Sequence, residues 1–282
     1  MYAARSVSPV MQCEAALRSV TVRQPQLGHV TAFVLSPRQR ARIVDSLQNK
    51  AALAFVHSFD ELLTKLRSSV APVDVVILPG RDDNGTGAER VIRHVKVSRP
   101  RAAIVAWCSV QQSPELGALA GAGIHEFILS GLNDTGVMLR SVVEAARRAS
   151  AAEQVMSQLS SIIPAELQPV AEAIVTKPAE ITSIRDIASE LGIHRKTLFN
   201  WARRAGSLAP AELLAWCRLA LVAYHLEATG CTVETISLEL SYPSPNSLRN
   251  TLKRYTGMTA SELRRRGAFS LLLAALRLKL SA

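Results

Sequence analysis

The chain has 282 residues, 48% of them hydrophobic, which excludes a mainly disordered protein and is long enough for two domains. Its formal net charge of +10 favours an anionic partner. Residues 1–160 hold 18 Lys or Arg against 13 Asp or Glu, and residues 161–282 hold 15 against 10, so charge singles out neither half.

The N-terminus lacks the apolar block of a signal peptide, and residues 1–28 are expected to form a weakly ordered tail. No run of about 18 uncharged apolar residues occurs, so no transmembrane helix and no membrane partner are expected. The cysteines Cys13, Cys108, Cys217 and Cys231 form no CxxC pair and are interpreted as reduced thiols without a metal. These features predict a cytoplasmic protein that needs no cofactor.

Between residues 29 and 150, short apolar runs alternate with helical patterns. The expected strands are 29–36, 53–58, 73–79, 102–109 and 124–131. The expected helices are 38–50, 59–69, 87–98, 113–123 and a long helix from about residue 134. This alternation predicts an α/β domain with a doubly wound, five-stranded parallel sheet, whose sites lie at the carboxyl ends of the strands.

The order of these elements, together with VDVVIL at 73–78 and AGAGIHEFILSG at 120–131, resembles the receiver domain of two-component response regulators. The resemblance implies a receiver or flavodoxin-like fold for residues 29–150. Receivers hold Mg²⁺ with acidic residues after the first strand and accept a phosphoryl group on an Asp that ends the third. They also use a hydroxyl at the end of the fourth strand and a Lys at the end of the fifth.

None of these chemical groups stands at the matching positions of this chain. The residues found there are Ser36 and Pro37, Pro79, Trp107 or Cys108, and Ser130. We therefore expect a pseudo-receiver that holds no metal and no aspartyl phosphate by that route. Such a domain can serve in docking or dimerisation, or hold a small ligand.

Two features of the loop after the third strand leave alternatives open. Asp82 or Asp83 could act as a displaced phosphoryl acceptor, although both lie three or more residues past the strand. The segment Gly85-Thr86-Gly87 could offer backbone N–H groups to an anion, or could simply connect strand and helix.

A contact surface is also implied by the resemblance. In receivers it is formed by the fourth helix, the fifth strand and the fifth helix. The apolar residues that this places near an interface, unless they belong to the core, are Leu129, Leu132, Met138, Leu139 and Val142.

Residues 151–164 are rich in Ala, Ser and Gln and are expected to form a linker. Beyond this linker, one motif occurs twice. The first copy is IRDIASELGIHRKTLFNWARRAG from Ile184, and the second is VETISLELSYPSPNSLRNTLKRYTG from Val233. Each copy predicts a short apolar helix, a tight turn and a second helix with a basic, polar face. This is the layout of a helix-turn-helix, whose second helix enters the DNA major groove.

The segment from about residue 165 to residue 266 resembles the DNA-binding domain of the AraC/XylS family of transcription regulators. The resemblance rests on helix-turn-helix units at 182–206 and 232–257, a connecting helix at 210–228, and the ending GMTASELRRR at 257–266. It implies an all-α double helix-turn-helix domain at 165–267, with seven helices and recognition helices about one DNA turn, roughly 34 Å, apart. Residues 268–282 could pack back as an amphipathic helix, or bind a partner or a membrane surface.

The candidate DNA contacts are the outward-facing residues at the start of and along the two recognition helices. They are Arg195, Lys196, Thr197, Phe199, Asn200, Arg203, Arg204, Ser244, Asn246, Ser247, Arg249, Asn250, Lys253 and Arg254. Lys and Arg suit phosphates or guanine edges, and Asn suits adenine edges. The family pattern assigns base reading to Lys196, Phe199, Asn200, Asn246, Ser247 and Asn250, although Phe199 could instead be a packing residue. The family usually has Arg where Asn200 and Asn250 stand, and Gly where Ser241 stands.

The sequence thus predicts a sequence-specific transcription regulator that is not an enzyme. It would bind double-stranded promoter DNA, contact RNA polymerase, and use its N-terminal domain for a homodimer or a regulatory partner. One alternative is an adaptor protein that binds DNA weakly, and another is a phospho-accepting receiver that uses Asp82 or Asp83. A DNA-repair methyl acceptor is a third, but the cysteine spacing cannot build the zinc site of that class.

Overall fold

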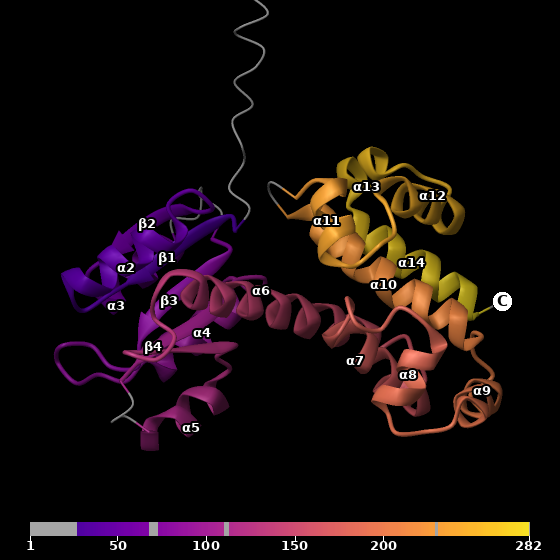
Figure 1. The fold of residues 1–282 in the computed structure, drawn as a ribbon, viewed down its shortest axis with the longest axis horizontal. Helices are drawn as coiled ribbons and strands as arrows, with labels where there is room; N and C mark the ends of the chain where they lie inside the picture. Colours follow the sequence, from indigo (N-terminus) through magenta and orange to yellow (C-terminus); the bar gives the residue numbers. More distant parts are fainter. Residues whose placement is uncertain (1–26, 68–72, 110–112, 229–230, 282) are drawn as a thin grey trace, which may run out of the picture.

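The computed structural model describes residues 27–67, 73–109, 113–228 and 231–281, which form an α/β domain followed by an all-helical domain (Figure 1). Almost all of the tail expected at 1–28 lies outside the described residues. Leu27 is nevertheless buried, and its backbone N–H donates to the carbonyl of Lys50 at 2.7 Å. Residue 27 therefore already belongs to the folded domain.

Five parallel strands form the sheet of the first domain. They are β1 (His29–Phe33), β2 (Ala52–Val56), β3 (Val75–Pro79), β4 (Ala103–Cys108) and β5 (Glu126–Leu129). Their order in the sheet is β2-β1-β3-β4-β5, with Ile77 of β3 opposite Val105 of β4. This is the doubly wound order of flavodoxin-like folds, and it confirms the predicted receiver-like fold.

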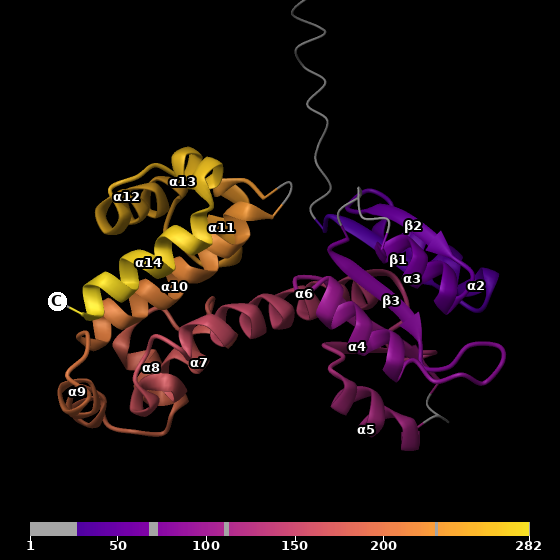
Figure 2. The same cartoon turned by 180° about the vertical axis from the view of Figure 1, so that it is seen from behind.

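Helices cover both faces of the sheet (Figure 2). One face packs against α2 (Pro37–Leu47) and α6 (Gly136–Leu159), and the other against α3 (Phe59–Arg67), α4 (Glu89–Ser98) and α5 (Ser113–Ala122). Side chains alternate between the faces along a strand, so Val75 and Ile77 join the first core and Val76 and Leu78 the second. Burial on both faces explains why these strands are continuous apolar runs.

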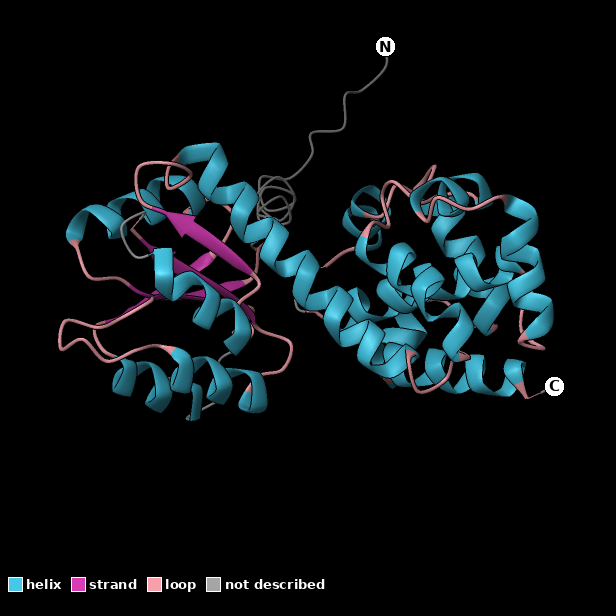
Figure 3. Ribbon diagram, turned by 90° about the horizontal axis from the view of Figure 1, so that it is seen from below, coloured by secondary structure: helices cyan, strands magenta, loops and turns pink. Residues whose placement is uncertain are grey.

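Helix α6 is a single helix of 24 residues that is shared by both domains (Figure 3). Its first half buries Leu139 and Val143 against the sheet, while its second half buries Val155 and Leu159 in the helical domain. The expectation of a linker at 151–164 is therefore wrong for residues 151–159. Alanine has the highest helix propensity, and the small side chains of Ala151 and Ala152 pack in the same core as α7 (Gln168–Thr176).

The helical domain is built around α10 (Pro210–Glu227), which is buried along most of its length. Its other elements are η2 (Ala165–Leu167), α8 (Ile184–Glu190), α9 (Arg195–Arg204), α11 (Val233–Glu239), α12 (Pro245–Thr256), α13 (Ala260–Arg266) and α14 (Ala268–Leu280). Among the described residues, α7 to α13 correspond to the seven expected helices. Helix α14 packs along α10 through Leu272 and Leu276, and the N–H of Phe269 donates to Glu227 at 2.8 Å. Of the two alternatives for the tail, the structure shows the packed one.

The five residues considered for a contact surface divide between core and surface. Leu139 is fully buried, and Leu129 and Val142 are partly buried against the two cores of the sheet domain. Leu132 and Met138 are exposed, at 64% and 59%. Of these five residues, Leu132 and Met138 can therefore belong to an outward-facing apolar surface.

The thiols that the structure describes are all buried. Cys108, Cys217 and Cys231 are free thiols, and burial raises the pKa of Cys217 to about 12, so this thiol stays protonated at neutral pH. Cys13 lies outside the described residues. Within the part of the chain that is described, no helix combines the length and apolarity needed to cross a membrane.

Candidate nucleic-acid interface

The two copies of the repeated motif fold into equivalent helix-turn-helix units. In the first turn, Gly192 N–H donates to Ser189 at 3.2 Å and Ile193 N–H to Ala188 at 2.9 Å. Forty-nine residues later, Ser241 N–H donates to Leu238 at 3.2 Å and Tyr242 N–H to Ser237 at 2.8 Å. Gly192 and Ser241 both have positive φ, at 62° and 51°. The same backbone turn therefore stands between α8 and α9 and between α11 and α12.

The second turn is made with a residue that disfavours its conformation. A left-handed φ costs a non-glycine residue about 1–2 kcal/mol, and Ser241 is exposed. We expect Ser241→Gly to raise the free energy of unfolding by about 1 kcal/mol, measured by urea denaturation. Gly192→Ser is the matched reverse change, because a Cβ at Gly192 meets no atom within 4 Å, and it should destabilise by a similar amount. Equal stability of Ser241→Gly and the natural chain would contradict this reading.

Apolar anchors fix each recognition helix to its unit. On α9 the buried anchors are Leu198 and Ala202, and on α12 they are Leu248 and Leu252. These pairs are spaced i, i+4 and leave the opposite helix faces to solvent. The N-termini are capped by side chains, with His194 accepting from Lys196 N–H at 3.2 Å and Ser244 from Ser247 N–H at 3.1 Å.

Helix α9 lies by the start of α10 and α12 lies beside α13, both on the side of the domain away from the sheet (Figures 1 and 2). Most of the predicted contact residues are exposed: Arg195, Lys196, Phe199, Arg203, Arg204, Ser244, Asn246, Arg249, Asn250, Lys253 and Arg254. The remaining three, Thr197, Asn200 and Ser247, are half-buried. Phe199 is 51% exposed.

Some of these side chains already have partners on the protein. The carboxamide oxygen of Asn200 accepts from Arg203 at 3.1 Å, and that of Asn246 accepts from Arg249 at 3.0 Å. Arg249 also forms an ion pair with Glu234 on α11. The pKa of Glu234 is lowered, first by its own backbone N–H and then by Arg249. Arg249 must therefore exchange a carboxylate for a phosphate if it is to contact DNA.

The other cations on the two helices have no carboxylate partner among the described residues. They are Arg195, Lys196, Arg203, Arg204, Lys253 and Arg254. Four of them stand in the last turns of α9 and α12, where a positive charge also interacts favourably with the helix dipole. Each recognition helix thus carries uncompensated positive charge beside exposed amides or hydroxyls.

A residue that sequence reasoning missed holds the two units together. Arg218 on α10 is only 7% exposed, and its guanidinium donates to the carbonyls of Pro178, Ile181 and Leu240. Pro178 and Ile181 precede the first unit, whereas Leu240 ends α11 in the second. The guanidinium also lies 4.8 Å from the ring centroid of Tyr242, whose burial raises the pKa of its hydroxyl. Arg218 is the only Lys or Arg in α10, which was the one available signal.

A family model described as a helix-turn-helix domain matches residues 187–266, which include α9, α10, α11, α12 and α13. The chain carries an AraC-type helix-turn-helix domain. The resemblance read from the repeated motif is thereby confirmed. The chain therefore combines a receiver-like α/β domain with a C-terminal helix-turn-helix domain of the DNA-binding type.

Comparison with curated proteins finds no match. Solved structures that resemble the chain include a DNA-binding transcriptional dual regulator from Escherichia coli K-12, with 23% identity, a TM-score of 0.34, and coverage of 38% of this chain and 96% of that one. A response regulator receiver domain protein from Clostridium thermocellum has 12% identity, a TM-score of 0.38, and coverage of 46% and 98%. RcsB from Salmonella enterica serovar Typhimurium, bound to promoter P1flhDC with the phosphomimetic BeF3-, has 17% identity, a TM-score of 0.37, and coverage of 68% and 98%. The receiver-like fold is established by the strand order and not by these likenesses.

The receiver-like domain that precedes the AraC-type domain has unusual groups at the carboxyl ends of its strands. After β1, Ser36 caps α2 by accepting from Gln39 N–H at 3.3 Å. Pro79 ends β3 opposite Trp107 of β4. The indole N–H of Trp107 donates to the hydroxyl of Ser130 at 2.9 Å, so the positions expected to hold a hydroxyl and a lysine bond to each other. No group of three or more His, Cys, Asp or Glu residues that could bind a metal occurs among the described residues.

The loop after β3 uses the carboxylate of Asp82 for its own structure. One oxygen of Asp82 accepts from the N–H groups of Asn84 at 3.0 Å and Thr86 at 2.7 Å. The backbone of Asp82 also bonds to Thr86 and Gly85. Asp82 thus holds the loop in shape through its own side chain and backbone.

Proposed function

We propose that α9 and α12 read successive major-groove segments of one promoter site. The observation that carries this proposal is the presence of two equivalent helix-turn-helix units, each with an outward basic and polar recognition helix, tied to one buried helix through Arg218. Two recognition elements in one chain can bind an extended site without dimerisation. In the major groove, amides and cations on such helices discriminate bases, while contacts to phosphate position the protein.

Selection of binding sites from random DNA fragments at about 150 mM salt tests this proposal. The expected result is a long motif with two elements about one helical turn apart, roughly 10 base pairs. A single short element would mean that only one unit reads bases. No enrichment, together with a shallow salt dependence, would favour an adaptor that binds DNA weakly.

Base reading and phosphate binding should separate experimentally. Asn250→Ala removes an exposed amide on α12 and should relax specificity at one base position, at a cost of about 1–3 kcal/mol on the preferred site. Arg254→Ala is the matched comparison on the same helix, and it should weaken all sequences alike and reduce the salt slope by about one. Binding titrations on the selected site and on single-base variants distinguish the two. If both substitutions weakened every sequence equally, the assignment of Asn250 to a base would be wrong.

We further propose that the receiver-like domain regulates the AraC-type domain without phosphorylation and that the protein is not an enzyme. The proposal is supported by Pro79 at the acceptor position and by the bond between Trp107 and Ser130. This domain also has an apolar surface, formed by the exposed side chains of Leu132, Val137 and Met138. Such a surface suits contact with a regulatory partner, RNA polymerase or a second copy of the chain.

Incubation of the full chain with acetyl phosphate and Mg²⁺, followed by intact mass measurement, tests the absence of phosphorylation. No phosphoryl adduct is expected. An adduct that disappears in Asp82→Asn or Asp83→Asn would show that a displaced acceptor exists and would overturn this part of the proposal. An adduct retained in both variants would locate the acceptor elsewhere, with the same consequence.

A further inference from the structure

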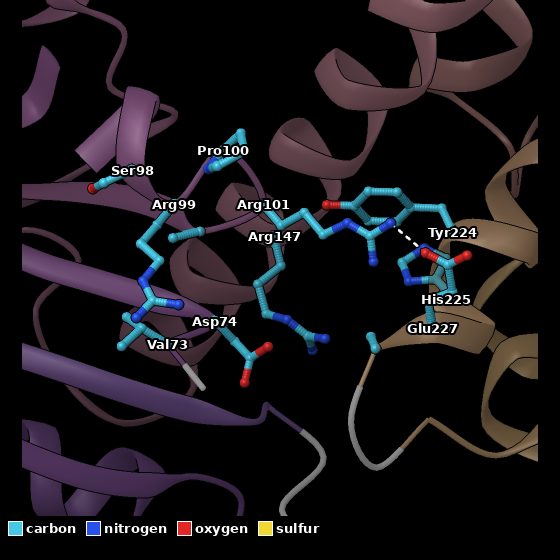
Figure 4. Close-up of a pocket in the computed structure, with 12 residues that line it drawn as sticks. Val73, Asp74, Ser98, Arg99, Pro100, Arg101, Arg147, Tyr224, His225 and Glu227 are labelled. Atoms are coloured by element: carbon cyan, nitrogen blue, oxygen red, sulfur yellow. Dashed lines mark hydrogen bonds and ion pairs between the residues drawn. The ribbon is translucent and has the colours of Figure 1, made fainter. Parts of the chain in front are cut away.

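A cavity of about 350 Å³ lies where the receiver-like domain meets the AraC-type domain (Figure 4). Its walls come from both parts of the chain: the residues just before β3, the connection between α4 and β4, Arg147 on α6, and the end of α10. This volume falls within the range of small-molecule sites, about 300–1,000 Å³. The cavity is distant in sequence from every predicted DNA contact and has no role in the function described above.

Arginines outnumber carboxylates by one on the cavity wall. Arg99, Arg101 and Arg147 contribute guanidinium groups, against the carboxylates of Asp74 and Glu227. Both carboxylates are held by the protein itself. Asp74 accepts from the backbone N–H of His29 at 2.8 Å and contacts its ring nitrogen at 3.3 Å.

The second carboxylate closes the contact between the two domains. Glu227 forms an ion pair with Arg101, drawn as a dashed line in Figure 4, and accepts from Phe269 N–H at 2.8 Å. The guanidinium of Arg101 also lies 4.9 Å from the ring centroid of Tyr224. Arg101 is therefore committed to α10, and Arg99 and Arg147 bring two further positive charges to the cavity wall.

Arg99 and Arg147 approach the cavity from different elements. Arg99 donates one hydrogen bond, to the carbonyl of Leu66 at 3.1 Å, and a guanidinium has five N–H donors. Figure 4 shows the side chain of Arg147 extending from α6 into the space between Asp74 and the end of α10. Planar guanidinium groups bind carboxylate and phosphate oxygens in bidentate geometry.

His225 adds a polar group to the cavity wall. Its side chain lines the cavity and the residue is only 5% exposed, with its ring centroid 5.7 Å from that of Tyr224, edge-on. Burial lowers the pKa of His225, so the imidazole is neutral at pH 7 and can donate one hydrogen bond or accept one. A ligand in the cavity can use that bond.

We propose that this cavity binds a small organic anion whose carboxylate or phosphate group pairs with Arg99 and Arg147, while its body lies against Tyr224 and His225. Such a ligand would touch α6 and α10 at once. Because α10 carries both helix-turn-helix units, an occupied cavity would stabilise one placement of the receiver-like domain against them. This regulatory consequence rests on the proposed DNA-binding function, whereas the binding site itself does not.

Thermal unfolding of the full chain with a matched set of probes tests the site. Benzoate, phenyl phosphate and phenol share one ring and differ in the acidic group, and inorganic phosphate supplies the anion without a ring. At concentrations up to about 10 mM, one of the two ring anions should raise Tm by a few degrees, and phenol should not. Which anion acts identifies the acidic group as carboxylate or phosphate. If neither ring anion raises Tm, or inorganic phosphate alone does, the proposal is overturned.

Variants then assign the effect to the cavity. Arg99→Gln and Arg147→Gln should each raise the anion concentration needed for half of the effect at least tenfold. Arg93→Gln is the matched control, since Arg93 is exposed on α4 and does not line the cavity, and it should respond as the natural chain does. The Tm of each variant without anion shows that it folds. An unchanged response in both cavity variants would place the anion elsewhere and contradict the proposal.

The regulatory consequence has its own readout. DNA affinity is measured on the selected site with and without the effective anion, and a change of several-fold is expected. Stabilisation by the anion without any change in DNA affinity would leave a ligand site but overturn its coupling to α10. Failure of the chain to bind DNA would overturn the proposed function and leave the thermal result standing.

Discussion

Replacing Arg218 with methionine is expected to lower the free energy of unfolding by about 3–5 kcal/mol, the largest effect on stability that we predict for a single substitution. Methionine retains much of the aliphatic volume and removes every donor. The carbonyls of Pro178, Ile181 and Leu240 would then lose the guanidinium in a region where all three residues are buried. A buried acceptor without a partner costs about 1–3 kcal/mol.

Urea denaturation of the full chain measures this effect. Arg277→Met is the matched control, because Arg277 is exposed on α14, and it should change stability by no more than about 0.5 kcal/mol. Since Arg218 joins the segment before α8 to the end of α11, the variant should also lose preference for the spacing between the two DNA elements while each unit still binds. A variant as stable as the natural chain, with unchanged spacing preference, would show that the hydrogen bonds of Arg218 are dispensable.

Removing the uncompensated charges from the last turns of α9 and α12 is expected to have the largest effect on DNA binding. The four residues changed to alanine are Arg203, Arg204, Lys253 and Arg254. If each neutralises one phosphate, the slope of log affinity against log salt should fall by about 3–4. At about 150 mM salt this corresponds to a loss of roughly a hundred- to a thousand-fold in affinity.

The control for this variant carries the same change in net charge elsewhere. Arg38, Arg40, Arg90 and Arg93 are exposed on α2 and α4 of the receiver-like domain. Alanine at these four positions should leave the salt slope almost unchanged, because screening limits charges that lie far from the DNA. An equal loss in both variants would mean that net charge, and not the recognition helices, drives binding.

Local sequence patterns predicted the elements of this protein well. The run VDVVIL gave β3 because every second side chain is buried on the same face of the sheet. The two helix-turn-helix units could be predicted because apolar anchors recur every three or four residues along a helix. Ile187 and Leu198 are buried anchors of the first unit, and Ile236 and Leu248 are their counterparts in the second. Even the turn at Ser241 could be located from its match to Gly192, although its φ could not.

The prediction of a linker at 151–164 was wrong for residues 151–159 because it rested on amino-acid composition. Tertiary packing decides whether such a segment is helical. Ala, Ser and Gln are compatible with a loose connection and equally with a helix. In the structure, α6 continues to Leu159 because Val155 and Leu159 find buried partners in the helical domain. Most of the stability of a helix comes from such packing, which a local window does not contain.

The sequence by itself determined the kinds of elements, their order, and which recognition-helix residues face solvent, since all of these follow from periodicity along the chain. Only the tertiary structure decided what Arg218 and His225 do. Arg218 bonds to carbonyls 22, 37 and 40 residues away, and the cavity beside His225 has walls from both domains. A sequence shows that a charged or titratable side chain is present in an apolar helix, but its partners are fixed by long-range packing.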